Sequence, residues 1–147
     1  MPRITVPACL EHLDSAKDYL KSHIPEKFKL QVDNVILVAE ELLVNVFSYA
    51  YPEGANGEAQ IALDVEEIGG EDKLVFCVKD WGAPFNPFEE VEDPDLTLDG
   101  EQRPVGGLGI LLTKKLMDEV TYQRKDGQNH LRLVKIIPLS DKENTKN

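Results

Sequence analysis

The sequence predicts an α+β protein, folded as a two-layer sandwich in which helices cover one face of a mixed, mostly antiparallel sheet. Three observations support this prediction. Several segments alternate apolar and polar residues as half-buried strands do. Three other segments repeat apolar residues every three or four positions, which is typical of helices. The strands are joined mainly by short turns, so hairpins with helices packed on one side are the expected arrangement.

The first half of the chain is expected to contain a strand, two helices and a hairpin. Residues 3–6 alternate like a short strand, and residues 11–22 keep helical spacing before a proline. Residues 31–50 form the clearest helix, with an apolar stripe along their whole length. The hairpin pairs residues 60–66 with residues 74–78 across a Gly-Gly turn.

The second half begins with a long loop and ends with a second hairpin. Residues 81–104 carry several prolines and no sustained period, and a loop of this length inside a domain is usually functional. A helix follows at residues 106–117, and residues 119–124 and 131–137 are the last two strands. We expect one domain over residues 1–140 and a polar tail at residues 141–147.

The composition favours one soluble domain and excludes several classes of protein. The 147 residues carry a formal net charge of −11, which repels a phosphate backbone, so no nucleic-acid partner is expected. No apolar run is long enough to cross a membrane, and the expected location is the cytoplasm. Cys9 and Cys77 are not spaced like metal ligands and are expected to be buried. His12, His23 and His130 show no paired metal-ligand spacing either.

Glu41 and Asn45 are polar residues inside the apolar helix expected at residues 31–50. They lie four positions apart, so they project from one face about one turn from each other. That face flanks the apolar stripe, where an unpaired polar group costs about 1–3 kcal/mol. A solvated helix edge or a salt bridge accounts for the pattern, and so does a site for a hard cation. The spacing alone leaves these interpretations open.

Asp80 ends the second strand of the first hairpin and is followed by Trp-Gly-Ala-Pro-Phe. A carboxylate at a sheet edge beside apolar groups can accept a hydrogen bond from a flat, amine-bearing ring. Asp before this Trp-Gly pair is also an ordinary turn signal, in which the carboxylate would bond nearby backbone N–H groups. Both interpretations remain open for Asp80.

The segment Gly-Gly-Leu-Gly at residues 106–109 opens the third helix. Glycines at this place expose N–H groups at the positive end of the helix dipole, where an anion can bind. The segment matches neither of the familiar phosphate loops, and an ordinary helix start explains it equally well. Arg103 lies three residues earlier, where it could reach a terminal phosphate or pair with an acidic neighbour such as Glu101.

The three signals occur in one order along the chain: Glu41-x-x-x-Asn45, then Asp80-x-Gly82-x-Pro84, then Gly106-Gly107-x-Gly109. In this combination the chain resembles the GHKL ATP-binding superfamily with the Bergerat fold, whose N box and two glycine boxes these segments match. Within that superfamily it is similar to the anti-sigma-factor serine kinases of bacterial partner-switching systems. The resemblance extends over residues 3–138 and implies an ATP lid at about residues 86–105.

The resemblance implies a role for each matching residue. Asn45 would coordinate the Mg²⁺ that bridges the phosphates of ATP, and Glu41 would act as general base on the attacking hydroxyl. Asp80 would bind the amino group of adenine, and Gly82 would let the ring approach. The other nucleotide-binding residues it implies are Pro84, Phe85, Arg103, Gly106, Gly107, Leu108 and Gly109. The family often has a threonine on a late strand, where this chain has Leu-Arg-Leu at residues 131–133.

The implied activity is that of an ATP-dependent protein serine/threonine kinase. It would transfer the γ-phosphate of ATP to a serine or threonine of an anti-anti-sigma (STAS-like) partner. As an anti-sigma factor it would also bind a sigma factor, and a homodimer is expected. Two other activities stay open at this level: a nucleotide-gated binding protein with weak or no catalysis, and a stand-alone ATPase.

Overall fold

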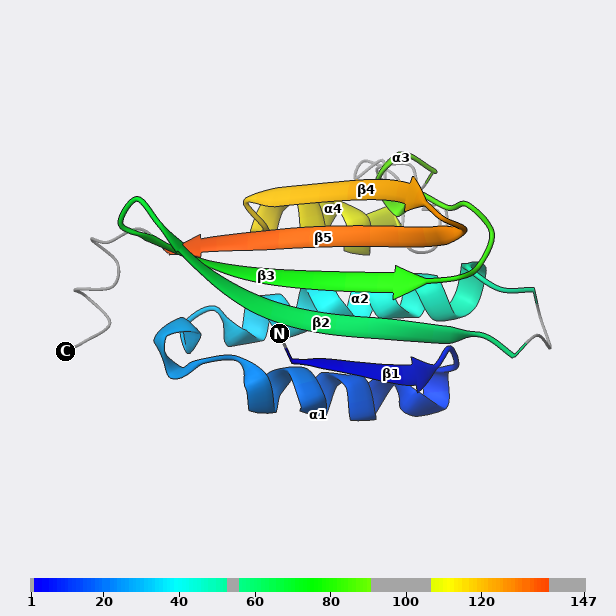
Figure 1. Ribbon diagram of the computed structural model, residues 1–147, viewed down its shortest axis with the longest axis horizontal. Coiled ribbons are helices and arrows are strands. Elements are labelled where there is room, and N and C mark those ends of the chain that lie inside the picture. The colour runs from blue at the N-terminus through cyan, green and yellow to red at the C-terminus, as the bar shows by residue number, and fades with distance from the viewer. Residues whose placement is uncertain (1, 53–55, 91–106, 138–147) are drawn as a thin grey trace.

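A five-stranded sheet forms one layer of the protein, as the computed structural model shows (Figure 1). The structure describes residues 2–52, 56–90 and 107–137. The strand order is β1-β2-β3-β5-β4. Their bounds are β1 (Arg3–Pro7), β2 (Glu58–Ile68), β3 (Glu71–Asp80), β4 (Glu119–Lys125) and β5 (Gln128–Ile137). Every pairing among these strands is antiparallel, so the predicted fold class is confirmed, with an antiparallel sheet in place of a mixed one.

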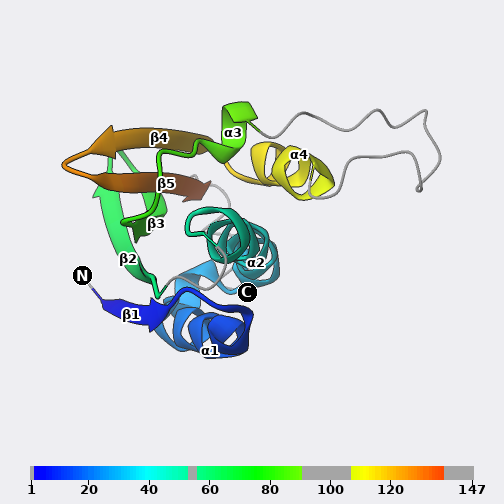
Figure 2. The same ribbon diagram turned by 90° about the vertical axis from the view of Figure 1, so that its right-hand side faces the viewer.

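The helices form the second layer and lie on one face of the sheet (Figure 2). They are η1 (Leu10–His12), α1 (Leu13–His23), η2 (Glu26–Phe28), α2 (Val32–Tyr49), α3 (Pro87–Glu90) and α4 (Gly107–Leu116). The central helix α2 buries one side against the sheet, with residues such as Leu42 and Val46 no more than 4% exposed. No helix in the described ranges combines the length and the apolar character needed to cross a membrane.

Both strands of the first hairpin, β2 and β3, are longer than the apolar pattern predicts. Gly69 and Gly70 adopt φ values of 62° and 81°, which make a tight turn that other residues would strain to form. Pairing therefore continues up to Ile68 opposite Glu71. The sequence does not predict these longer strands, because the residues near the turn are polar and the alternation of apolar residues ends where the core ends.

Apart from shifts of one residue, the structure also differs from the predicted bounds in three ways. Residues 10–12 form a 3₁₀ turn, so α1 begins at Leu13. The predicted long loop contains the short helix α3, whose Phe88 N–H donates to Asn86 Oδ1 at 3.0 Å. Strand β5 begins at Gln128, three residues earlier than predicted. The predicted lid is described only as far as residue 90, and the predicted tail at residues 141–147 lies outside the described residues.

The two cysteines correct a smaller prediction. Both are free thiols and both are half-buried, whereas the sequence suggested buried positions. Cys77 faces away from the helices on β3, and its burial raises the pKa of its thiol. Cys9 immediately precedes η1.

Candidate functional site

Helix α2 contacts both glycine segments that the structure describes. At its end, the Ala83 N–H donates to Ala50 O at 3.0 Å, which holds the loop after β3 against the helix. A Cβ added to Gly82 would lie 2.0 Å from Ala50 O, so only glycine fits there. Two turns earlier, a Cβ added to Gly109 of α4 would lie 2.0 Å from Glu41 Oε2. The three sequence signals therefore meet around one helix.

Asp80 is buried at the end of β3, with 3% of its surface exposed. Its Oδ1 accepts hydrogen bonds from Gly82 N–H at 2.9 Å and from Asn129 Nδ2 at 2.9 Å. The turn interpretation of the sequence is thus correct for Oδ1. Within the described residues no hydrogen bond reaches Oδ2, which leaves that oxygen able to accept one from a ligand.

Asn129 is a residue of this site that the sequence alone did not indicate. It is 2% exposed and lies opposite Asp80 in the pairing of β3 with β5. Besides Asp80 it donates to Ala83 O at 2.8 Å, and its Oδ1 accepts from Phe85 N–H at 3.2 Å and Tyr122 Oη at 2.5 Å. One amide thus fixes both the carboxylate and the loop that follows it. The available signal was a polar residue two positions before the predicted strand at residues 131–137.

The electrostatics of Asp80 are set mainly by burial. Desolvation raises the pKa of its carboxyl above the usual aspartate value, because burial disfavours the charged form. The hydrogen bonds from Asn129 and Gly82 act in the opposite direction, and so does the positive charge of Arg124. Arg124 Nη1 donates to Gly82 O at 2.7 Å, which places that charge beside the loop.

Glu41 and Asn45 lie on α2 as the sequence predicted, Glu41 half-buried and Asn45 only 5% exposed. The neighbouring Glu40 pairs with Lys17 at 3.4 Å, whereas the described residues give Glu41 no ion pair. The described residues give the Asn45 side chain no hydrogen bond. A buried amide without a hydrogen bond can be satisfied by a ligand, and its oxygen can coordinate Mg²⁺.

The structure describes four of the remaining predicted site residues, and two others lie outside the described ranges. Pro84 is exposed, and half-buried Phe85 has its ring centroid 5.9 Å from that of Tyr49. Gly107 and Leu108 are the first residues of α4. Arg103 and Gly106 lie outside the described residues.

We expect Gly82→Ala to destabilise the protein by about 1–3 kcal/mol, because the new methyl group meets backbone that cannot rotate away. Thermal unfolding of the purified variant measures the effect. The control is Ala83→Ser, which changes an exposed side chain in the same loop and should leave the unfolding temperature unchanged. Equal stability of Gly82→Ala and the original protein would contradict the close approach.

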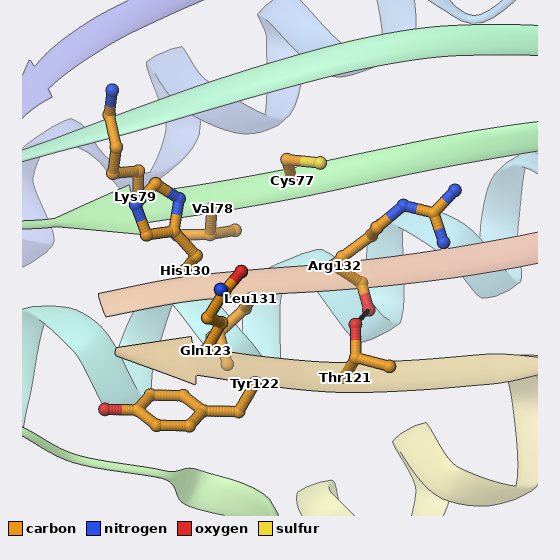
Figure 3. A pocket seen from close by; sticks show the side chains of 9 residues that line it. All are labelled: Cys77, Val78, Lys79, Thr121, Tyr122, Gln123, His130, Leu131 and Arg132. Carbon is orange, nitrogen blue, oxygen red and sulfur yellow. Dashed lines mark hydrogen bonds between the residues drawn. The ribbon is translucent and has the colours of Figure 1, made fainter. Parts of the chain in front are cut away.

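A separate hollow of about 440 Å³ lies on the face of the sheet that the helices leave open (Figure 3). Lys79 and Arg132 give it a cationic lining, and His130 lies beside them. Burial and the neighbouring lysines lower the pKa of His130. None of the site residues predicted from the sequence lines this hollow. It is therefore distinct from the arrangement around α2.

Comparison with known proteins gives a consistent result. The profile of the histidine kinase-like ATPase domain family matches residues 6–135. The serine-protein kinase RsbW of Bacillus subtilis (strain 168) is 33% identical over 102 residues, which are 66% of this chain and 60% of RsbW. The serine/threonine-protein kinase BtrW of Bordetella bronchiseptica is 34% identical over 97 residues, which are 66% of this chain and 65% of BtrW.

A third relative is the serine-protein kinase RsbW of Listeria monocytogenes serovar 1/2a, 29% identical over 99 residues. These residues are 65% of this chain and 60% of that protein. The match to each of the three relatives thus spans less than two thirds of the relative's own length.

Proposed function

The chain belongs to the histidine kinase-like ATPase domain family, and from this premise we propose that it is an ATP-dependent protein serine/threonine kinase. One observation supports the proposal most: α2 carries Glu41 and Asn45 and contacts both Gly82 and Gly109. A binding site for a base and a site for phosphates would then lie along one helix. The names of the similar kinases support the same activity.

The base end of the proposed site is built around Asp80. Its Oδ2 would accept a hydrogen bond from the amino group of adenine, while Asn129 and Gly82 hold Oδ1. Both donors favour the ionised carboxylate, which can only accept. A base with a carbonyl oxygen at that position would meet a second acceptor, so the site would discriminate in favour of adenine.

The phosphate end involves Asn45, Glu41 and the start of α4. The Asn45 oxygen would hold Mg²⁺, which neutralises phosphate charge when it is bound with ATP. Glu41 would accept the proton of the attacking hydroxyl, one turn of helix from Asn45. Gly106, Gly107 and Gly109 would donate backbone N–H groups to the phosphates, with Leu108 between them and Arg103 near the terminal phosphate.

The proposed substrate is a serine or threonine of an anti-anti-sigma (STAS-like) protein. The protein would act in the cytoplasm as a homodimeric anti-sigma factor that also binds a sigma factor. The support for these partners is the ordered motif set and the similarity to RsbW and BtrW. The acidic charge of −11 is consistent with protein partners and unfavourable for a nucleic acid.

The proposal is tested by incubating the full chain with Mg²⁺ and ATP labelled at the γ-phosphate, together with a panel of STAS-like proteins. We expect label on a serine or threonine of one partner. Bound ATP without transfer to any partner would contradict the kinase proposal and favour a nucleotide-gated binding protein. Steady phosphate release in the absence of a partner would instead indicate a stand-alone ATPase.

Gly109→Ala is expected to reduce transfer without destabilising the fold. The new methyl group would overlap Glu41 Oε2 and Cδ, at 2.0 and 2.6 Å, and this flexible side chain can move aside. Alanine favours a helix over glycine by about 0.5–1 kcal/mol, so the unfolding temperature should stay equal or rise. A base displaced by about 1 Å lowers the transfer rate on the order of 100-fold.

The control for Gly109→Ala is Lys115→Ala, which changes an exposed residue of the same helix. Initial rates of transfer and thermal unfolding are measured for both variants. An unchanged rate in Gly109→Ala would show that the position of Glu41 does not govern transfer.

A further inference from the structure

Three side chains of types that can bind a metal ion gather at the 3₁₀ turn between β1 and α1. One ligand atom each from Cys9, Glu11 and His12 lies within 4.8 Å of the other two. The sequence spacing matches no common metal motif, so the sequence alone does not indicate a site here. The backbone brings the three together, because the His12 N–H donates to Cys9 O at 3.0 Å and closes the turn.

These side chains have no other role in the part of the chain that the structure describes. The described residues give none of the three a side-chain hydrogen bond or an ion pair. Cys9 and His12 are half-buried and Glu11 is exposed, so an ion from solvent can reach them. Cys9 also lines a hollow of about 440 Å³ with Pro7, Ala8, Asn56, Gly57 and Glu58, which leaves space for a fourth ligand.

The chemistry of the donors selects the ion. A thiolate and an imidazole are the ligands that Zn²⁺ prefers, and a carboxylate completes three positions of a tetrahedral site. In such a site zinc lies about 2.0–2.3 Å from its ligands, so neighbouring ligand atoms are about 3.3–3.7 Å apart. The present separations, at most 4.8 Å, exceed those values by no more than about 1.5 Å. Mg²⁺ prefers oxygen ligands and would not compete for the thiolate.

We propose that Cys9, Glu11 and His12 form a zinc-binding site with water in the fourth position. The site is separate from the residues assigned to ATP and Mg²⁺, and it does not depend on the proposed kinase activity. Its ligands must lose their protons to bind, so affinity falls as the pH is lowered.

The test is a titration of the metal-free, nucleotide-free full chain with Co²⁺, followed by displacement with Zn²⁺. We expect one Co²⁺ per chain, with the intense d–d bands of a tetrahedral complex and a thiolate-to-metal charge-transfer band. Cys9→Ser should remove the charge-transfer band, and Cys9→Ser and His12→Ala should each weaken binding at least about tenfold. Circular dichroism verifies that each variant is folded.

The matched controls are Cys77→Ser and His23→Ala, which alter the other free thiol and an exposed histidine. Both should bind Co²⁺ like the original protein. Failure of the original protein to bind Co²⁺, or a charge-transfer band that survives Cys9→Ser, would overturn the proposal. ATP binding, measured separately in chelator, should be the same in Cys9→Ser and the original protein, which keeps this test apart from that of the kinase.

Discussion

Asp80→Asn is expected to abolish high-affinity binding of ATP while leaving the protein folded. An asparagine can keep both hydrogen bonds of Asp80 Oδ1, because its own Oδ1 still accepts from Gly82 and Asn129. The Nδ2 of the new asparagine takes the place of Asp80 Oδ2. A hydrogen-bond donor then faces the amino group of adenine, where the carboxylate had an acceptor. Losing a charge-assisted hydrogen bond and opposing two donors costs about 2–4 kcal/mol, on the order of 100-fold in Kd.

The same substitution should not lower stability, which separates a binding defect from a folding defect. Burial raises the pKa of Asp80 in the folded protein. Because the pKa is higher in the folded protein than in the unfolded chain, protonation of Asp80 favours folding. This contribution to the free energy of unfolding is complete below the unfolded pKa, about 3.9, and it is lost as the pH rises through the folded pKa. At neutral pH the buried charge is therefore a net cost, which asparagine avoids.

Thermal unfolding at two pH values measures this effect. At neutral pH we expect an unfolding temperature for Asp80→Asn that is equal to or above that of the original protein. The difference should shrink in acid, where Asp80 itself becomes neutral. Asp64→Asn is the control, since Asp64 is a half-buried aspartate of β2 remote from Gly82. Unchanged ATP affinity in Asp80→Asn, or loss of affinity together with loss of stability, would contradict the proposed role.

The parts of the site that follow from local sequence were predictable. Helical spacing placed Glu41 and Asn45 on one face of α2, and the end of the apolar strand placed Asp80 at its edge. The family inferred from three short motifs is confirmed by the profile match over residues 6–135. Each of these inferences needs only a periodicity or an order along the chain.

The part that was missed depends on pairing between distant strands. Asn129 meets Asp80 across 49 residues, and the hydrogen bond exists because β5 begins at Gln128 and pairs in one register with β3. The apolar pattern began at residue 131, so the sequence excluded Asn129 from the strand. No hairpin turn joins β3 to β5, so their register depends on which side chains each strand packs on the buried face, and this is not visible in a single window of sequence.

The position of Glu41 against Gly109 is likewise a product of tertiary packing. Helices α2 and α4 are separated by the sheet strands β2 and β3 in the chain, and they meet only when both pack on one face (Figure 2). From the sequence, glycine at the start of α4 was expected to expose backbone N–H groups to an anion. The structure adds a second reason for that glycine, since any side chain there would displace Glu41.

Glu41→Gln is expected to keep nucleotide binding and remove phosphoryl transfer. Glutamine has the shape of glutamate, so it can occupy the same space beside Gly109, yet it cannot take the proton of the attacking hydroxyl. Loss of a general base lowers the rate by about 10²–10⁴. Transfer of labelled phosphate to the partner and titration with ATP are measured on the same preparation.

Glu40→Gln is the matched control for Glu41→Gln, because it changes the adjacent glutamate of the same helix. Glu40 faces Lys17 at 3.4 Å, and losing a partly exposed pair of this kind costs under about 1 kcal/mol. Transfer should survive in Glu40→Gln. If Glu41→Gln transfers phosphate as fast as this control, Glu41 is not the base, and the contact with Gly109 serves packing alone. If both variants bind ATP and only Glu41→Gln fails to transfer phosphate, Glu41 acts in the chemical step.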